Sequence, residues 1–382
     1  METKKFIDIL EIYNGKNQKS VENPDGKYPI YGSGGVMGRA DEYICPAETV
    51  VIGRKGSINN PIFVTEPFWN VDTAFGLVAR KEILLPKYLF YFCRYFDFEK
   101  LNTTVTIPSL TKANLLKIEI PIPSIIEQKS IVTKLNLLTD MIQQHQEQLT
   151  KLDELIKARF VEMFGDPSDN AEGWPILSLN DIISTIESGW SGNGKQRKKA
   201  PGEIAVLKVS AVTKGYFIPT ECKVLDDQSN IKKYVFPQKG DLLFSRANTR
   251  EMVGATALIN QDYPELILPD KLWKIQFSEN VDVVYMKYIL SSKTIRDLFS
   301  AASTGTSGSM YNVSMEKFRS IVVPIPPLSL QNQFADFVAE VDKFKFVILL
   351  LYRFFGTGSI CKRGKLGVFY IAHIMRPSRW KT

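Results

Sequence analysis

Apolar residues recur at alternating steps of four and three along one long stretch near the middle of the chain. These positions are Ile131, Leu135, Leu138, Ile142, Leu149, Leu152 and Ile156. Only His145 interrupts the pattern, and the positions between are rich in Gln, Lys, Glu and Asp, which is typical of a coiled-coil helix. Pro121 and Pro123 precede the stretch and Gly165-Asp166-Pro167 follows it. The sequence therefore predicts one helix of roughly 38 residues, about 57 Å long, which would hold its two ends apart.

The segments on either side of this helix have shorter apolar runs. Runs bounded by Gly, Asn and Asp are typical of β-strands separated by turns, and they lie at residues 49–52, 61–64, 204–209 and 241–244. Helical patterns are found at residues 85–98 and 285–299. We therefore expect an α+β chain with two globular segments, each followed by a helix.

A proline-rich sequence at the start of the long helix occurs again 203 positions later. Ile120-Pro121-Ile122-Pro123 corresponds to Val323-Pro324-Ile325-Pro326, and Gln128 corresponds to Gln331. Three apolar helix positions also correspond: Ile131, Leu135 and Leu138 in the first copy, and Phe334, Val338 and Val341 in the second. Self-similarity at a fixed offset indicates a duplicated structural unit. We interpret the chain as a tandem duplication of one domain followed by one helix.

The second copy departs from the first at Lys345, which corresponds to Ile142. It continues with an apolar run at residues 346–351 and then a basic tail. Our interpretation is that the second helix is truncated or altered. A genuine amphipathic or partner-binding tail is the alternative.

Composition argues against several classes of protein. The net charge of +7 comes from the tail, because the seven Lys and Arg residues from Arg353 onward leave 41 basic residues facing 41 acidic ones. The four cysteines are far apart and there are only two histidines, so little material exists for a zinc site or a Ser-His-Asp arrangement. With no apolar run of membrane-spanning length and no secretory signal at the N-terminus, a cytoplasmic protein is expected.

Two glycine-rich segments approach known motifs without matching them. Gly189–Gln196 has the glycine and lysine spacing of a phosphate-binding loop, but Gln196 replaces the Ser or Thr that would bind magnesium. In Gly32–Gly38 the third glycine is one position late for a dinucleotide loop, so a tight turn is favoured. The Asn/Asp-Pro-Pro-Tyr/Phe tetrapeptide of amino-methyltransferases is missing. Any methylation would therefore be performed by another chain.

The duplicated unit resembles the specificity (S) subunit of Type I restriction-modification systems. The resemblance covers residues 1 to 345. It depends on the paired proline-rich segments with Gln128 and Gln331, on the helix end Lys151–Phe160, and on the sequence Gly240–Asn248. It implies that each of two target-recognition domains reads one half of a bipartite DNA site, and that the helices pair as an antiparallel coiled coil and set the spacing.

The same resemblance implies the division of the chain and its partners. We expect recognition domains at residues 1–122 and 167–325, a spacer helix at 123–166, a truncated second helix at 326–353 and an atypical basic tail at 354–382. The expected partners are double-stranded DNA, two modification (methyltransferase) subunits and restriction/translocase subunits, with no membrane. The chain would be non-catalytic and hold no cofactor, whereas S-adenosylmethionine, ATP and magnesium would be bound by partner subunits.

Candidate DNA-binding residues lie on loops that combine cations with amides and hydroxyls, because those side chains contact phosphates and base edges. In the first domain they are Arg54, Lys55, Ser57, Asn59 and Asn60. In the second domain they are Lys195, Arg197, Lys198, Ser245, Arg246, Asn248, Thr249 and Arg250. We expect Arg246 to occupy the position equivalent to Arg54.

Each of these loops also has a simpler interpretation as a solvated turn, and the neutrality of residues 1–352 leaves room for other functions. One is a coiled-coil scaffold protein whose globular domains bind other proteins. The altered second helix leaves a further alternative, a silent or phase-variable specificity protein.

Overall fold

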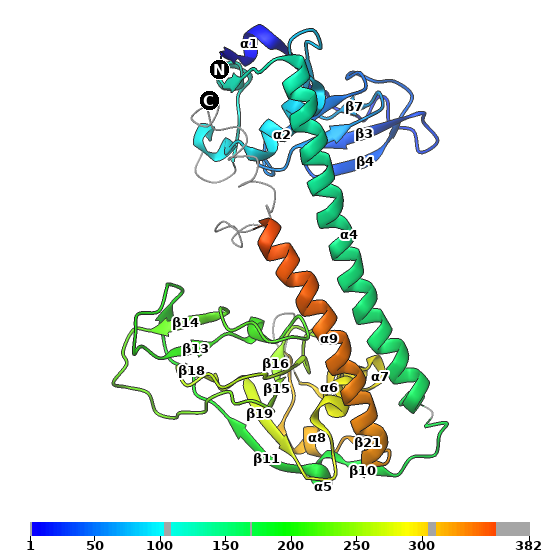
Figure 1. The fold of residues 1–382 in the computed structure, drawn as a ribbon, viewed down its shortest axis with the longest axis vertical. Helices are drawn as coiled ribbons and strands as arrows, with labels where there is room; N and C mark the ends of the chain where they lie inside the picture. Colours follow the sequence, from blue (N-terminus) through cyan, green and yellow to red (C-terminus); the bar gives the residue numbers. More distant parts are fainter. Residues whose placement is uncertain (1, 103–107, 169, 305–310, 357–382) are drawn as a thin grey trace. The chain divides into compact units, whose positions relative to one another are not determined.

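The computed structural model describes residues 2–102, 108–168, 170–304 and 311–356. It forms two compact units, one of Met1–Gln148 with Ile348–Thr382 and one of Leu149–Val347 (Figure 1). Of the basic tail expected at 354–382, residues 357–382 lie outside the described residues. None of the helices in the described ranges is long and apolar enough to cross a membrane.

The first unit is built on a four-stranded antiparallel sheet in the order β2-β8-β5-β6. Its strands are β2 (Leu10–Asn14), β5 (Thr49–Gly53), β6 (Ile62–Val64) and β8 (Ala74–Ala79). A second sheet pairs β3 (Tyr28–Gly32) with β4 (Gly35–Ala40) and, in parallel, with β7 (Trp69–Asn70). The short strands β1 (Thr3–Lys5) and β9 (Glu119–Pro121) pair separately. Every residue of β5 is buried, which fits the apolar run Val50-Val51-Ile52, and the hydroxyl of the buried Thr49 donates to the Pro46 carbonyl at 2.7 Å.

Short helices complete the first unit. They are α1 (Phe6–Ile9), α2 (Pro86–Tyr95), the 3-10 helix η1 (Phe98–Leu101) and α3 (Lys112–Leu115). The predicted helix at 85–98 thus ends earlier than expected, because Phe96 is extended and closes α2. The hydrophobic core of the unit is formed by Phe6, by side chains on the inner face of the first sheet and by the buried face of α2.

The second unit repeats this plan. Its antiparallel sheet has the order β11-β19-β15-β17, formed by β11 (Ile183–Ser188), β15 (Leu242–Ser245), β17 (Thr256–Leu258) and β19 (Leu272–Phe277). A second sheet, β12-β14-β13-β18, again contains one parallel pair, β13 with β18. Its strands are β12 (Gly194–Lys195), β13 (Ala205–Leu207), β14 (Cys222–Leu225) and β18 (Leu266–Ile267). Two short pairs remain: β10 (Ile176–Ser178) with β21 (Val322–Pro324), and β16 (Ala247–Asn248) with β20 (Tyr311–Asn312).

The helices of the second unit correct one prediction. They are α5 (Leu179–Ile182), the 3-10 helix η2 (Val209–Ala211), α6 (Val283–Ser291), α7 (Lys293–Ala302) and α8 (Met315–Arg319). The single helix expected at 285–299 is therefore wrong. Ser292 has an extended backbone and its hydroxyl accepts the Ile295 N–H as the N-cap of α7, which separates α6 from α7.

Equivalent hydrogen bonds confirm the duplication inferred from the sequence. Gln128 and Gln331 are both fully buried. The side-chain oxygen of Gln128 accepts the Leu85 N–H at 2.8 Å, and that of Gln331 accepts the Asp282 N–H at 2.8 Å. Leu85 and Asp282 are the residues that immediately precede α2 and α6. The two amide groups also donate to a carbonyl five residues earlier, that of Pro123 or Pro326.

Two more pairs of residues extend this equivalence. The Tyr88 hydroxyl donates to the Pro121 carbonyl and the Tyr285 hydroxyl to the Pro324 carbonyl, at 3.0 and 2.7 Å. Gly15 and Gly189 follow β2 and β11, and a Cβ at either would lie 1.7 or 1.9 Å from a backbone carbonyl oxygen. Only glycine fits such an approach. The repeated sequence therefore encodes one framework twice.

The long helix α4 (Ile125–Phe164) is continuous over 40 residues, as the sequence predicted. At its start, Ser124 and Glu127 form reciprocal hydrogen bonds between side chain and backbone, which is a capping box. At its end Gly165 adopts a φ of +75°, which stops the helix. The second helix, α9 (Leu328–Gly356), has 29 residues and reaches the end of the described range, so its predicted truncation stays a prediction.

Within the second unit, the end of α4 packs against the start of α9. The Phe160 and Phe164 rings lie 5.4 and 5.5 Å from the Phe334 ring, and Asp153 pairs with Lys345 at 2.7 Å. Because the partners follow each other in opposite order along the two helices, these segments run antiparallel (Figure 1). Lys345, where the sequence repeat fails, does not interrupt α9. It is largely buried between Asp153 and Asp342.

Candidate nucleic-acid interface

The first candidate loop begins where β5 ends, and its leading residue is Arg54. The Arg54 N–H donates to the Thr73 carbonyl at 2.7 Å, and the Arg54 carbonyl accepts the Leu110 N–H at 2.9 Å. Its guanidinium donates to the Asp72 carbonyl at 3.5 Å and lies 5.7 Å from the Phe75 ring centroid. The backbone is fixed on both sides, while the side chain remains exposed. Arg54 therefore projects a charge from a rigid position.

The rest of this loop divides into exposed and structural residues. Lys55, Ser57 and Asn60 are exposed. Asn59 is half-buried, its oxygen accepts the Phe98 N–H at 2.7 Å, and its amide donates to Asp97 at 3.2 Å. Both polar atoms of Asn59 thus tie the loop to η1. Ser57 and Asn60 are better placed than Asn59 to contact a ligand.

Arg246 occupies the equivalent position in the second unit, as the sequence predicted. Its N–H donates to the Lys271 carbonyl at 3.1 Å, and its carbonyl accepts the Val313 N–H at 2.9 Å. The Arg246 Nε donates to the Asp270 carbonyl at 2.9 Å, as the Arg54 guanidinium does to Asp72. Arg246 is more buried than Arg54. Part of its guanidinium is therefore used to hold the loop.

The segment around Arg246 requires one correction. Ser245 is fully buried, because it is the last residue of β15 inside the sheet, so it does not lie on the surface where we expected a DNA contact. Asn248 is half-buried and donates to the Ser245 hydroxyl at 3.4 Å. Thr249 and Arg250 are exposed. The Arg250 Nε donates to Ser300 at 3.3 Å and its guanidinium lies 5.9 Å from the Tyr311 ring centroid, so its orientation is partly set.

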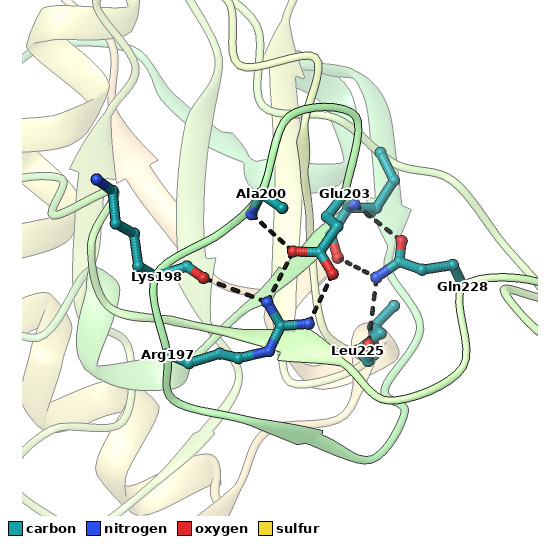
Figure 2. A network of polar contacts seen from close by, with 7 residues as sticks. Arg197, Lys198, Ala200, Glu203, Leu225 and Gln228 are labelled. Atoms are coloured by element: carbon teal, nitrogen blue, oxygen red, sulfur yellow. Dashed lines mark hydrogen bonds and ion pairs between the residues drawn. The ribbon is translucent and has the colours of Figure 1, made fainter.

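The basic cluster at residues 195–199 is partly neutralised by acids from other segments. Arg197 forms a two-pronged ion pair with Glu203, at 2.7 and 2.6 Å, which Figure 2 shows face to face. Lys199 pairs with Glu265 at 3.0 Å. In the described part of the unit, Lys195 and Lys198 are exposed and have no acidic partner within 4.0 Å. The cluster therefore offers fewer unpaired cations than its sequence suggests.

The Arg197–Glu203 pair is held by the surrounding backbone. The hydrogen bonds from Arg197, and then that from the Ala200 N–H, lower the pKa of Glu203 to about 2. The adjoining Gln228 side chain bonds both backbone groups of Ile204 and the Leu225 carbonyl (Figure 2). Glu203 remains ionised at any physiological pH, so it keeps opposing Arg197.

Sequence reasoning missed these acidic partners. Glu203 lies only six residues after Arg197, so the sequence alone could have suggested it as an ion-pair partner. Glu265 is next to β18, far along the chain from Lys199, and gives no local signal. The pairing of β13 with β18 brings it close.

Over the described ranges, no group of three or more His, Cys, Asp and Glu residues could hold a metal ion. Burial raises the pKa of the Cys45 thiol to about 12 and that of the Cys93 thiol further still. A thiol that stays protonated is a poor nucleophile. These two cysteines therefore act as small apolar residues of the core.

Taken together, the two units define a protein with two copies of one α+β domain, each presenting an arginine-led loop and each followed by a long helix. The family model for the Type I restriction modification DNA specificity domain matches residues 1–154 and 171–348. This chain belongs to that family.

Individual relatives agree. The Escherichia coli Type I restriction enzyme EcoEI specificity subunit is 24% identical over 261 residues, which are 66% of this chain and 43% of that protein. The EcoKI specificity subunit, also from E. coli, is 25% identical over 64% of this chain and 54% of that protein. The chain thus spans about half the length of these two relatives. A putative Haemophilus influenzae specificity subunit, S.HindORF215P, is 25% identical over 90% of this chain and 88% of its own length.

A solved structure shares the fold. The Type-I restriction-modification system S subunit from M. genitalium superposes with a TM-score of 0.57 at 14% identity, over 98% of this chain and 94% of that one.

Proposed function

We propose that this chain is the DNA sequence-specificity subunit of a Type I restriction-modification complex. Each domain would read one half of a bipartite site, and the helices would set the spacing and dock two modification subunits. The observation that carries the proposal is the equivalence of Arg54 and Arg246, which the duplicated framework presents at the same place in two units. Membership of the family and the names of its relatives support it.

In this proposal the chain is a non-catalytic reader. The domains correspond to residues 1–122 and 167–325, with helical spacers at 123–166 and 326–353. The reading residues are Arg54, Lys55, Ser57 and Asn60 in the first unit, and Lys195, Lys198, Arg246, Asn248, Thr249 and Arg250 in the second. Asn59 and Arg197 support their loops. S-adenosylmethionine, ATP and magnesium would be bound by the modification and restriction/translocase subunits.

The proposal is tested by sequencing the methylated positions in host DNA with the gene present and deleted. We expect a split motif, two short sequences separated by a fixed gap, that is methylated only when the gene is present. An identical set of methylated motifs in both strains would contradict the proposal.

A further inference from the structure

The glycine-rich turn between β3 and β4 lies directly against the Arg54 loop. A Cβ built on Gly53 would lie 3.0 Å from the Ser33 Cβ and 2.5 Å from the Ser57 carbonyl oxygen. Gly53 precedes Arg54, and Ser33 lies in the turn of the hairpin. The absence of a side chain at Gly53 therefore allows two loops that are distant in sequence to touch.

Both loops are also attached to the same segment of backbone. The Val71 N–H donates to the Tyr31 carbonyl at 3.0 Å, and the Arg54 N–H donates to the Thr73 carbonyl at 2.7 Å. Residues 71–73 thus fix the end of β3 and the start of the Arg54 loop together. The hairpin and the loop form one continuous surface of the first unit.

The hairpin presents apolar side chains on this surface. Val36 and Met37 follow the turn and are 63% and 61% exposed. Beside them, Gly34 and Gly35 have open space where a Cβ would lie, and Gly35 has a φ of +126°, which favours glycine. Both side chains are largely open to solvent, although the Met37 Sδ lies over Gly32, 2.5 Å from where a Cβ would be. They are suited to contact another molecule.

The hairpin brings no available cation of its own to this surface. Arg39, at the base of β4, donates its guanidinium to the Gly26 and Lys27 carbonyls. The exposed cations Arg54 and Lys55 instead follow Gly53, where the turn of the hairpin touches β5. Cations contact phosphates or guanine, whereas an apolar side chain recognises the C5-methyl group of thymine in the major groove. The combined surface therefore matches both kinds of DNA contact.

We propose that the β3–β4 hairpin is a second reading element of the first unit, in which Val36 and Met37 contact thymine methyl groups next to the contacts of Arg54 and Lys55. This proposal rests on the proposed function. It assigns a role to the glycine-rich turn, whose glycine spacing does not fit a dinucleotide loop, and it predicts a thymine in the half-site read by the first unit.

The test uses the full chain assembled with its modification subunits, and duplexes carrying the methylated motif. Deoxyuridine replaces thymine at one position at a time, which removes only the methyl group. At one or more thymines of one half-site, we expect wild-type affinity to fall about fourfold, the effect of losing one buried methyl-sized contact. The double variant V36S/M37S should bind wild-type thymine duplex less tightly and should not respond further to deoxyuridine.

Two controls separate this proposal from its rivals. Ile7→Ser changes a residue of α1 that is 55% exposed, and it should keep the wild-type response to deoxyuridine. The salt dependence of binding should be the same for V36S/M37S and wild type, because no charge is removed.

Several outcomes would overturn the proposal. One is a V36S/M37S complex that responds to deoxyuridine as wild type does, while Arg54→Ala weakens binding; the reading function would then stand without the hairpin. Another is a variant that fails to assemble with modification subunits, which would make the hairpin a protein contact. A half-site without thymine would also exclude it. If the wild-type complex binds duplexes with and without the methylated motif equally well, the proposed function itself is wrong.

Discussion

The two units share a framework but differ in whether the cations of their loops form ion pairs with acidic residues. In the described part of the first unit, Arg54 and Lys55 have no acidic partner within ion-pair distance. In the second unit, Arg197 and Lys199 are paired with Glu203 and Glu265. The duplicated hydrogen bonds of Gln128 and Gln331 preserve the fold, while the loops attached to it diverge. A basic run in a sequence therefore does not show how many of its cations remain unpaired in the fold.

Replacing Gln128 and Gln331 tests whether their hydrogen bonds stabilise the framework that the two units share. Gln128→Ala should remove side-chain hydrogen bonds from three buried or partly buried backbone groups, those of Ile83, Leu85 and Pro123, whereas Gln331→Ala removes two. We expect the free energy of unfolding to fall by about 2 to 4 kcal/mol, with the larger loss for Gln128→Ala. Denaturant unfolding followed by circular dichroism measures it.

Gln144→Ala is the matched control, because Gln144 is an exposed glutamine of α4. It should change the free energy of unfolding by less than about 0.5 kcal/mol. A loss below about 1 kcal/mol for both buried glutamines would mean that they do not hold the framework.

The equivalence of the two arginines predicts similar losses of DNA affinity. Arg54→Ala and Arg246→Ala should each weaken binding of the assembled complex to its site by about 1 to 3 kcal/mol if the arginine contacts a base with two hydrogen bonds. Arg80→Ala is the control, since Arg80 is exposed and donates to the Asp8 carbonyl at the other end of β8. A titration of affinity against labelled duplex provides the measurement. Equal effects of Arg54→Ala and Arg80→Ala would remove Arg54 from the reading surface.

The buried charge of Lys287, a residue of the second unit, should lower the free energy of unfolding. Lys287 lies on α6 where the repeat places Phe90 in the first unit, and burial lowers its pKa to about 8, although Asp342 acts in the opposite direction. The charged form is thus less favourable in the folded protein. Stability from this group should rise with pH from about 8 toward the unfolded value of about 10.4, where the unfolded chain holds more protons.

Lys287→Met removes that charge and keeps the apolar stem. We expect its Tm to exceed the wild-type Tm by a few degrees at pH 7, and the difference to shrink above pH 8. Calorimetry at a series of pH values measures this. A variant with a lower Tm at pH 7 would indicate that the contact of Lys287 with the Tyr288 ring, at 4.1 Å, outweighs the cost of burial.

The smallest expected effect is on the salt dependence of DNA binding, and it comes from breaking the Arg197–Glu203 ion pair of the second unit. Glu203→Gln should release Arg197 and steepen the dependence of log affinity on log salt by about 0.9, the change for one further phosphate contact. Glu187→Gln makes the same change of charge at an exposed acid of β11 and releases no arginine. Identical salt slopes for the two variants would mean that Arg197 remains unavailable to DNA.

Local signals explain which features could be predicted from the sequence. The bounds of α4 follow from prolines before it and Gly165 after it, and the duplication follows from repeated proline and glutamine positions. The division of α6 from α7 was missed, although Ser292 is a favoured N-cap residue and gave a usable signal.

Contacts between distant segments could not be predicted in this way. The ion pair of Lys199 with Glu265 depends on the pairing of β13 with β18. The contact of the β3–β4 turn with Gly53 depends on two sheets meeting at residues 71–73. The sequence identifies such residues one by one, and the fold decides which of them lie together.

The central claim is that two similar readers are separated by a helical spacer, and one measurement tests it most directly. Residues 142–148 of α4 are duplicated, which adds one heptad before Asp153 and preserves the packing of Asp153, Phe160 and Phe164 in the second unit. Methylated sites are then mapped in host DNA. The account predicts that both half-site sequences stay the same and that the gap grows by about three base pairs, from about 10 Å of added helix. An unchanged gap between unchanged half-sites would contradict it.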